Sequence, residues 1–164
     1  MREVATTPLP DRAAIRDELA ETRDRFRALL NSLSAADWKV KSANPAWTVG
    51  QLMYHMAWAT GFMVSELNSA KRGRGFNPPR FVVDSVNVMI TRIGAMRANR
   101  ASIARKYDAG TDALIKALDG VRDEEWASSS TNFGVTNTVE HVFHIPAEHF
   151  SEHAPEILKA LGRG

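Results

Sequence analysis

Residues 138–157 read TVEHVFHIPAEHFSEHAPEI and hold four of the five histidines of the chain. The last two of these, His149 and His153, are four residues apart. On an α-helix this spacing places two side chains one turn apart on the same face, close enough to bind one metal ion. The fifth histidine, His55, lies in a second segment with helical periodicity, WTVGQLMYHMAWATGF (residues 47–62). We therefore expect a metal site made of one histidine from one helix and an HxxxH pair from another.

The composition narrows the classes of protein that this chain can be. With 164 residues and 44% hydrophobic content, we expect a single globular domain over residues 1–164. The chain has no cysteine, which excludes disulfides and thiolate metal sites, so a bound metal must use nitrogen and oxygen ligands. The formal net charge is +2 and no basic stripe is interleaved with aromatic residues, so no nucleic-acid partner is expected. There is no signal-like N-terminus and no apolar run of membrane-spanning length, which predicts a cytoplasmic protein without a membrane partner.

The spacing of apolar residues predicts two helices in the first half of the chain. A short extended segment (residues 1–10) precedes Asp11, which can cap the first helix. The inward positions of that helix alternate steps of three and four residues, as in a helix of a bundle. These positions are Ile15, Leu19, Thr22, Phe26, Leu29 and Leu33. Thr48 can cap the second helix, expected from about residue 49 to residue 68, and His55 falls on its apolar face.

The second half of the chain is also helical. A third helical region is expected from about residue 83 to residue 118, with a weak point near Gly94, and the histidine-rich segment forms the last helix. Residues 128–137 are polar and predict a loop. The only β-like run, at residues 81–83, is too short to form a sheet. The predicted class is therefore all-α.

The helical phase of the last segment decides which of its histidines can share a site. Relative to His149, an unbroken helix turns His153 by ~40°, His141 by ~80° and His144 by ~140°. Pro146 can kink the helix, and a bulge of one residue there would turn His144 towards the other two. We therefore keep His144 as a substrate-pocket candidate, together with Trp58, which follows His55 by three residues.

Other interpretations of the histidines have less support in the sequence. A buried cluster of neutral imidazoles without a metal is the plainer alternative, but three desolvated imidazoles without partners would be costly. The metalloprotease motif HExxH is absent, because residue 150 is a phenylalanine. Ser151 lies near the histidines, but no nucleophile elbow surrounds it. A metal site, with zinc or nickel as the ions best suited to imidazole ligands, is the favoured interpretation.

With these residues identified, the chain resembles the DinB/YfiT-like superfamily over nearly its whole length. The resemblance is carried by three short stretches: residues 33–38 (LSAADW), residues 47–52 (WTVGQL) leading to His55, and the His149–His153 pair followed by Ile157. Members often have a glycine-glutamine pair after the last histidine, where this chain has Pro155 and Glu156.

The resemblance implies an up-down-down-up four-helix bundle in which a histidine triad holds a divalent metal. The positions of that triad match His55, His149 and His153. Known relatives include mycothiol-dependent maleylpyruvate isomerases and bacillithiol S-transferases. The resemblance also implies a homodimer, which agrees with more apolar surface on the first and third helical regions than one bundle needs.

The chemistry of the expected site suggests the type of reaction. Three neutral imidazoles leave a divalent ion with an open position, and a thiol or water bound there would be acidified. Because the chain has no cysteine, a thiol must come from a small-molecule substrate. The first hypothesis is a metal-dependent thiol S-transferase or isomerase, and the alternatives are a metal-dependent hydrolase and a non-catalytic metal-binding stress protein. Glu152 and Glu156 are the candidate catalytic acids or bases, because they adjoin the triad in sequence.

Overall fold

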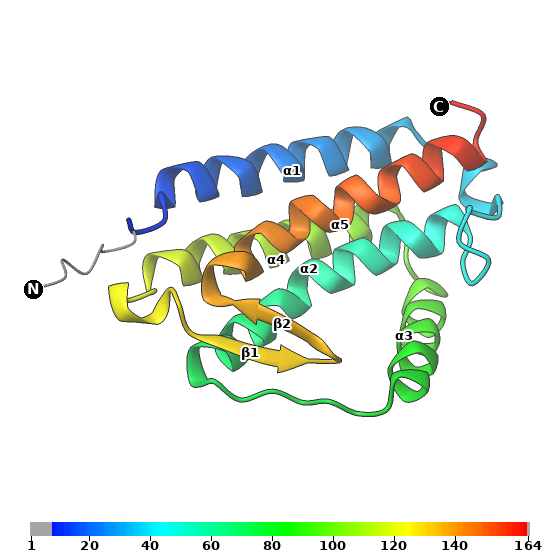
Figure 1. Ribbon diagram of the computed structural model, residues 1–164. Coiled ribbons are helices and arrows are strands. Elements are labelled where there is room, and N and C mark those ends of the chain that lie inside the picture. Colours follow the sequence, from blue (N-terminus) through cyan, green and yellow to red (C-terminus); the bar gives the residue numbers. More distant parts are fainter. Residues whose placement is uncertain (1–7, 164) are drawn as a thin grey trace, which may run out of the picture.

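The computed structural model describes residues 8–163, which form a helical bundle with one β-hairpin at its side (Figure 1). Most of the extended N-terminal segment expected from the sequence lies outside these residues. The helices are α1 (Arg12–Ser32), α2 (Val49–Arg72), α3 (Arg80–Ala95), α4 (Arg100–Asp119) and α5 (Val139–Ala160). Two short 3₁₀ turns (Asp37–Lys39 and Asp123–Glu125) and the strands β1 (Ser129–Asn132) and β2 (Val135–Thr138) complete the fold.

The helices α1, α2, α4 and α5 form a four-helix bundle, and their side-chain contacts give the direction of each. Three ion pairs join α1 to α4 in antiparallel order: Arg16 to Asp119, Arg23 to Asp112 and Arg27 to Asp108. The helices α2 and α4 run parallel, because Tyr54 lies against Lys106 and residue 61 against residue 110. The helices α1 and α5 are parallel as well, since Glu18 contacts His144 and Arg25 contacts Phe150. The order is up-down-down-up, which confirms the predicted fold (Figure 1).

Polar caps begin the first two bundle helices at the predicted residues. The Asp11 carboxylate accepts hydrogen bonds from the backbone N–H groups of Ala13 and Ala14. Thr48 and Gln51 form a reciprocal capping box at the start of α2. Such caps satisfy backbone donors that the first turn of a helix leaves free. The predicted inward positions of α1 are buried in the core, from Ile15 to Leu29.

The expected third helical region is two helices, and the break lies beyond Gly94. Asn99 forms a capping box with Ser102 and starts α4 in a new direction, which is why the chain turns at residues 96–99. Gly94 itself lies inside α3, where a Cβ atom would come within 2.1 Å of the Tyr54 hydroxyl. The glycine therefore serves close packing of α3 on α2.

The loop expected at residues 128–137 contains the β-hairpin. The strands pair from Ser129 with Thr138 to Asn132 with Val135. The two residues of the turn, Phe133 and Gly134, both have positive φ angles of 55° and 79°. Such a turn matches the twist of the two strands, but the sequence lacks the usual Asn-Gly signal and the strands are polar, so the pattern did not predict it.

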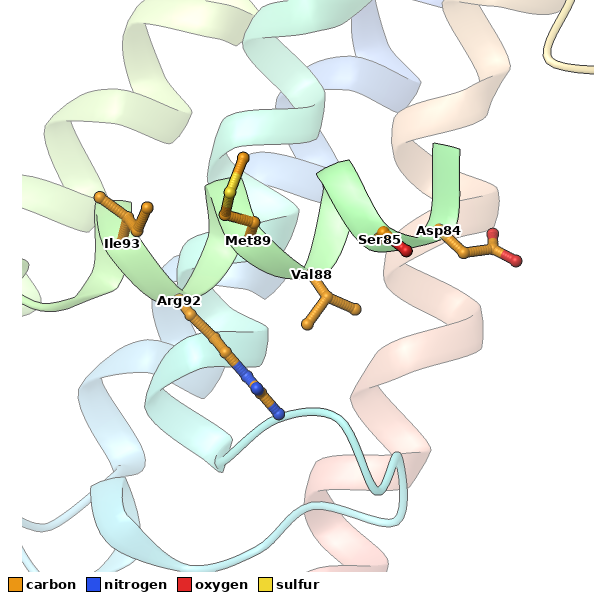
Figure 2. A pocket seen from close by; sticks show the side chains of 6 residues that line it. All are labelled: Asp84, Ser85, Val88, Met89, Arg92 and Ile93. Atoms are coloured by element: carbon orange, nitrogen blue, oxygen red, sulfur yellow. The ribbon is translucent and has the colours of Figure 1, made fainter. Parts of the chain in front are cut away.

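Helix α3 lies outside the bundle and packs on α2 (Figure 1). A hollow of about 610 Å³ runs along it and is lined by residues of α3 alone (Figure 2). Within it, Met89 and Ile93 extend from one side of the helix and are 53% and 61% exposed, while Arg92 points to the loop before α2 and donates to the carbonyl of Ala46. In residues 8–163, no helix combines the length and the apolar character needed to span a bilayer.

Candidate metal centre

The structure brings His55 of α2 together with His149 and His153 of α5. The Nε2 atom of His149 lies 3.1 Å from Nε2 of His55 and 3.0 Å from Nε2 of His153. The three residues each offer one ligand nitrogen, and these atoms all lie within 4.8 Å of one another. Convergence of three imidazole nitrogens from two facing helices is the arrangement by which helical bundles hold metal ions.

The outer nitrogens of two rings contact side chains that orient them. The Glu156 carboxylate lies 2.9 Å from Nδ1 of His153 and can only accept, which assigns the proton of that ring to Nδ1. The hydroxyl of Thr91, a fully buried residue of α3, lies 3.4 Å from Nδ1 of His55. Metal-binding histidines characteristically contact such partners through the nitrogen that faces away from the ion. With the proton of each ring on its outer nitrogen, the Nε2 lone pairs face one another, an arrangement that a cation between them stabilises.

Burial favours the neutral form of two rings. Desolvation, aided by the nearby His153, lowers the pKa of His55 to about 4. Desolvation is also the largest cause for His149, followed by the charges of His55 and His153, and the pKa falls to about 3. Neutral imidazole is the form that binds a metal ion, so at neutral pH these nitrogens are available as ligands. The donor set therefore fits a divalent cation.

Helix α3 and the loop before α2 close one side of the triad. The indole of Trp47 stacks on the His55 ring, with centroids 4.5 Å apart and planes at 24°. Arg92 ties this loop to α3 by donating to the carbonyl of Ala46. The position of His55 is thereby defined by three separate segments, although only its own helix was evident from the sequence.

A cavity of about 770 Å³ begins at His55 and extends between α2, α3, the hairpin and the first half of α5. Its walls are mainly apolar and aromatic, with few polar groups. Trp58, one of the two substrate-pocket candidates, lines this cavity and stacks on Phe62. Aliphatic residues of α3, such as Val83 and Ile90, form the wall opposite α2.

The remaining sequence candidates occupy different places. Pro146 lies within an unbroken α5, so the helical phase is kept and His144 faces α1, where Nδ1 lies 3.0 Å from the Glu18 carboxylate. His144 is not among the residues that line the cavity. Glu152 is exposed, and Glu156 contacts His153 as described.

Three residues that the sequence did not single out lie at the cavity. The Nε2 atom of His141 is 3.1 Å from the Glu148 carboxylate, and both residues line the cavity wall. Their separation of seven residues equals about two helical turns, so the sequence alone could have predicted that the two side chains share one face of the helix. Glu66 of α2 is the third, and it lies eleven positions after His55.

The comparisons with known proteins agree with this architecture. The family model for the DinB superfamily matches residues 10–157. Among solved structures, a mycothiol-dependent maleylpyruvate isomerase has a TM-score of 0.70 at 14% identity over 90% of this chain. The chain spans 61% of that isomerase's length. No curated protein matches the chain by sequence.

Another similar structure covers almost the same length as this chain. YfiT from Bacillus subtilis, described as a probable metal-dependent hydrolase with an unusual four-helix bundle topology, has a TM-score of 0.70 at 12% identity. The alignment covers 100% of this chain and 95% of YfiT. An uncharacterised protein from Clostridium difficile 630 aligns with a TM-score of 0.65 at 13% identity, over 93% of this chain and 96% of its own. The fold of this chain is thus the YfiT-like bundle.

Proposed function

We propose that this chain, which belongs to the DinB superfamily, is a metal-dependent thiol S-transferase or isomerase that acts with a small-molecule thiol. The observation that carries the proposal is the convergence of the nitrogens of His55, His149 and His153, of which His55 lines one end of a largely apolar cavity. A divalent ion there, zinc or nickel for imidazole ligands, would supply a Lewis acid that lowers the pKa of a bound thiol or water.

The residues of the chain prepare this site for a ligand. Glu156 and Thr91 orient two rings, so that their Nε2 atoms need little rearrangement on binding. The apolar walls formed by Trp58, Phe62 and Val83 offer water few hydrogen-bond partners, and a ligand that fills the cavity would strengthen electrostatic interactions at its end. The chain has no cysteine, so a thiol in the reaction must be brought by a substrate.

A metal-dependent hydrolase is the second candidate, and a specific observation favours it. Hydrolysis needs a group that accepts a proton from water, and the His141–Glu148 pair lines the same cavity. Of the relatives compared above, YfiT, the probable hydrolase, also matches this chain over almost its full length, whereas the isomerase extends well beyond it.

The proposal is tested by measuring metal content and activity on the same samples. Elemental analysis of purified protein should find a single divalent ion per chain, and His149→Ala should have none. His144→Ala is the matched control, because it removes a histidine of the same helix that faces α1. Each sample is then assayed for conjugation of low-molecular-weight thiols to an electrophile and for ester hydrolysis without thiol.

The outcomes separate the candidates. Thiol-dependent turnover that is lost in His149→Ala and kept in His144→Ala supports the transferase or isomerase. Turnover of the ester without thiol, with the same dependence on His149, supports the hydrolase. Bound metal with neither activity supports a non-catalytic metal-binding protein, and wild-type protein that binds no divalent ion refutes the metal site.

A further inference from the structure

The end of the cavity away from the triad contains a buried carboxylate. Glu66 of α2 is only 6% exposed and lines the cavity. One of its oxygens, Oε2, accepts a hydrogen bond of 2.9 Å from Nδ2 of Asn132 in β1. Among residues 8–163, no lysine, arginine or histidine forms an ion pair with Glu66, and Oε1 accepts no hydrogen bond. Oε1 therefore remains open to the cavity, and no cationic side chain of residues 8–163 pairs with it, although an unpaired carboxylate in an apolar cavity is costly.

Asn132, which donates to Oε2 of Glu66, has a structural role that does not involve Oε1 of Glu66. Oδ1 of Asn132 accepts from the backbone N–H of Phe76, and its Nδ2 also lies 3.3 Å from the hydroxyl of Ser130. Asn132 thereby joins α2, the linker before α3 and the hairpin. This role explains the contact to Oε2 of Glu66, and it would be served equally by a neutral glutamine. The negative charge and Oε1 have no structural use here.

A second acceptor without a partner lies on the face of the hairpin that carries Asn132. Asn137 of β2 is paired across the hairpin with Ser130, lines the cavity and is 7% exposed. Its Oδ1 is buried without a hydrogen-bond partner among the described residues. Unsatisfied buried acceptors are rare in folded proteins because each costs about 1–3 kcal/mol. A ligand with N–H donors would satisfy both Asn137 and Glu66.

Aromatic rings line the cavity near the same end. The rings of Trp58 and Phe62 are stacked with centroids 5.4 Å apart, Phe62 lies 6.2 Å from Phe133, and Phe133 lies 6.3 Å from Phe76. Aromatic faces attract cations, and the attraction is strongest where water is excluded. The aromatic walls at this end therefore favour a positive charge with an apolar body.

From these contacts we infer that the cavity binds an organic ammonium group at Glu66 and Asn137, with the remainder of the ligand extending towards the triad. His55 and Glu66 are eleven residues apart on α2, which turns them by only ~20° relative to each other and separates them by about 16 Å. Both line the cavity, so one ligand of this length can contact both ends. The inference rests on the proposed function only in placing the reactive part of the substrate at the triad.

The test compares two probes of equal shape and different charge. The protein is titrated by calorimetry with 4-phenylbutylamine, which is cationic at neutral pH, and with the neutral 4-phenylbutan-1-ol. A charge-assisted hydrogen bond contributes about 1.5–3 kcal/mol, so we expect the ammonium probe to bind about tenfold or more tightly than the alcohol. Equal affinities of the two probes for the wild-type protein, or no binding of either probe, would overturn the inference.

Variants identify the group that recognises the charge. Glu66→Gln keeps an acceptor for Asn132 and should reduce the preference for the ammonium probe to nearly onefold. Glu140→Gln makes the same charge change at an exposed position of α5 and should keep the preference. A preference that persists in Glu66→Gln would contradict the assignment of the charge to that carboxylate.

The same titrations in metal-depleted protein and in His149→Ala separate this inference from the proposed function. Because Glu66 lies at the other end of the cavity, the ammonium preference should survive in both samples. If wild-type protein binds no metal but keeps the preference, only the proposed function fails. If metal binds and the two probes bind equally, only the present inference fails.

Discussion

Replacing one imidazole of the triad should change how the metal-free protein responds to acid. The perturbation is His149→Gln, in chelator-treated protein, with stability measured from pH 7 to pH 4. In the folded protein the pKa of His149 is lowered from 6.5 to about 3, mainly by burial. The unfolded chain therefore takes up a proton at this residue as the pH falls below 6.5, while the folded protein does not until the pH approaches 3. Stability contributed by the neutral ring is present above pH 6.5 and is lost as the pH falls.

The size of the effect follows from this difference in proton uptake. A group protonated only in the unfolded state lowers the free energy of unfolding by about 1.4 kcal/mol per pH unit. Over the interval from pH 6.5 to pH 4, the wild-type protein should lose about 3 kcal/mol more than His149→Gln, which cannot take up this proton. Proton uptake by His55, whose pKa is lowered to about 4, is present in both proteins and cancels in the comparison to first order.

Urea denaturation followed by circular dichroism at a series of pH values measures this difference. His144→Gln is the control, because it removes a histidine of the same helix outside the triad. It should lose stability with falling pH as the wild-type protein does. Parallel curves of unfolding free energy against pH for wild-type protein and His149→Gln would refute the argument that burial keeps His149 neutral.

Four other outcomes are expected. Glu156→Ala, which removes the partner of His153 Nδ1, should weaken metal binding about 10- to 100-fold in a competition titration with a chelator, and unchanged affinity would show that this contact does not support the ligand. Chelation should lower the melting temperature while far-ultraviolet circular dichroism at room temperature stays helical, and unfolding on chelation would make the metal structural. Gly110→Ala should destabilise the bundle by about 1–3 kcal/mol, because its Cβ would lie 2.8 Å from the backbone nitrogen of Gly61, whereas Gly61→Ala meets no atom within 4 Å and serves as the control in urea denaturation. We also propose a homodimer in which the exposed apolar side of α3 takes part, so that light scattering should give twice 18.2 kDa and Met89→Glu should reduce it, while a persistent monomer mass in wild-type protein would contradict this proposal.

The helical phase predicted those parts of the fold that depend on a single element. Asp11 and Thr48 begin their helices as expected because capping is local, a matter of one side chain and the first turn. The pairing of His149 with His153 is likewise local, since it needs only an unbroken helix. The position of His55 beside the other two histidines could be predicted only by assuming that α2 packs against α5, and the structure shows this packing.

The parts that the sequence did not predict depend on contacts between distant segments. Thr91 contacts the His55 ring only because α3 folds back on α2, and no pattern in either helix indicates that packing. The hairpin is polar on both strands and gains its position from Asn132, which contacts the linker and α2. The sequence allowed Pro146 to kink the last helix and turn His144 towards the triad. In the structure α5 continues through Pro146 as a helix, and His144 contacts Glu18 of α1 instead.

The parallel arrangement of α2 and α4 has a consequence for how this protein can diversify. Two parallel neighbours cannot be joined by a tight turn, so residues 73–99 must travel back along the bundle before α4 can start (Figure 1). This return segment carries α3, which forms a wall of the cavity but contributes little to the interior of the four-helix core. Substitutions at cavity-facing residues of the return segment, such as Val83 and Ile90, can therefore reshape what enters the cavity, whereas Thr91 also contacts His55. The residues that form this wall of the cavity and the residues that fill the four-helix core are therefore largely different.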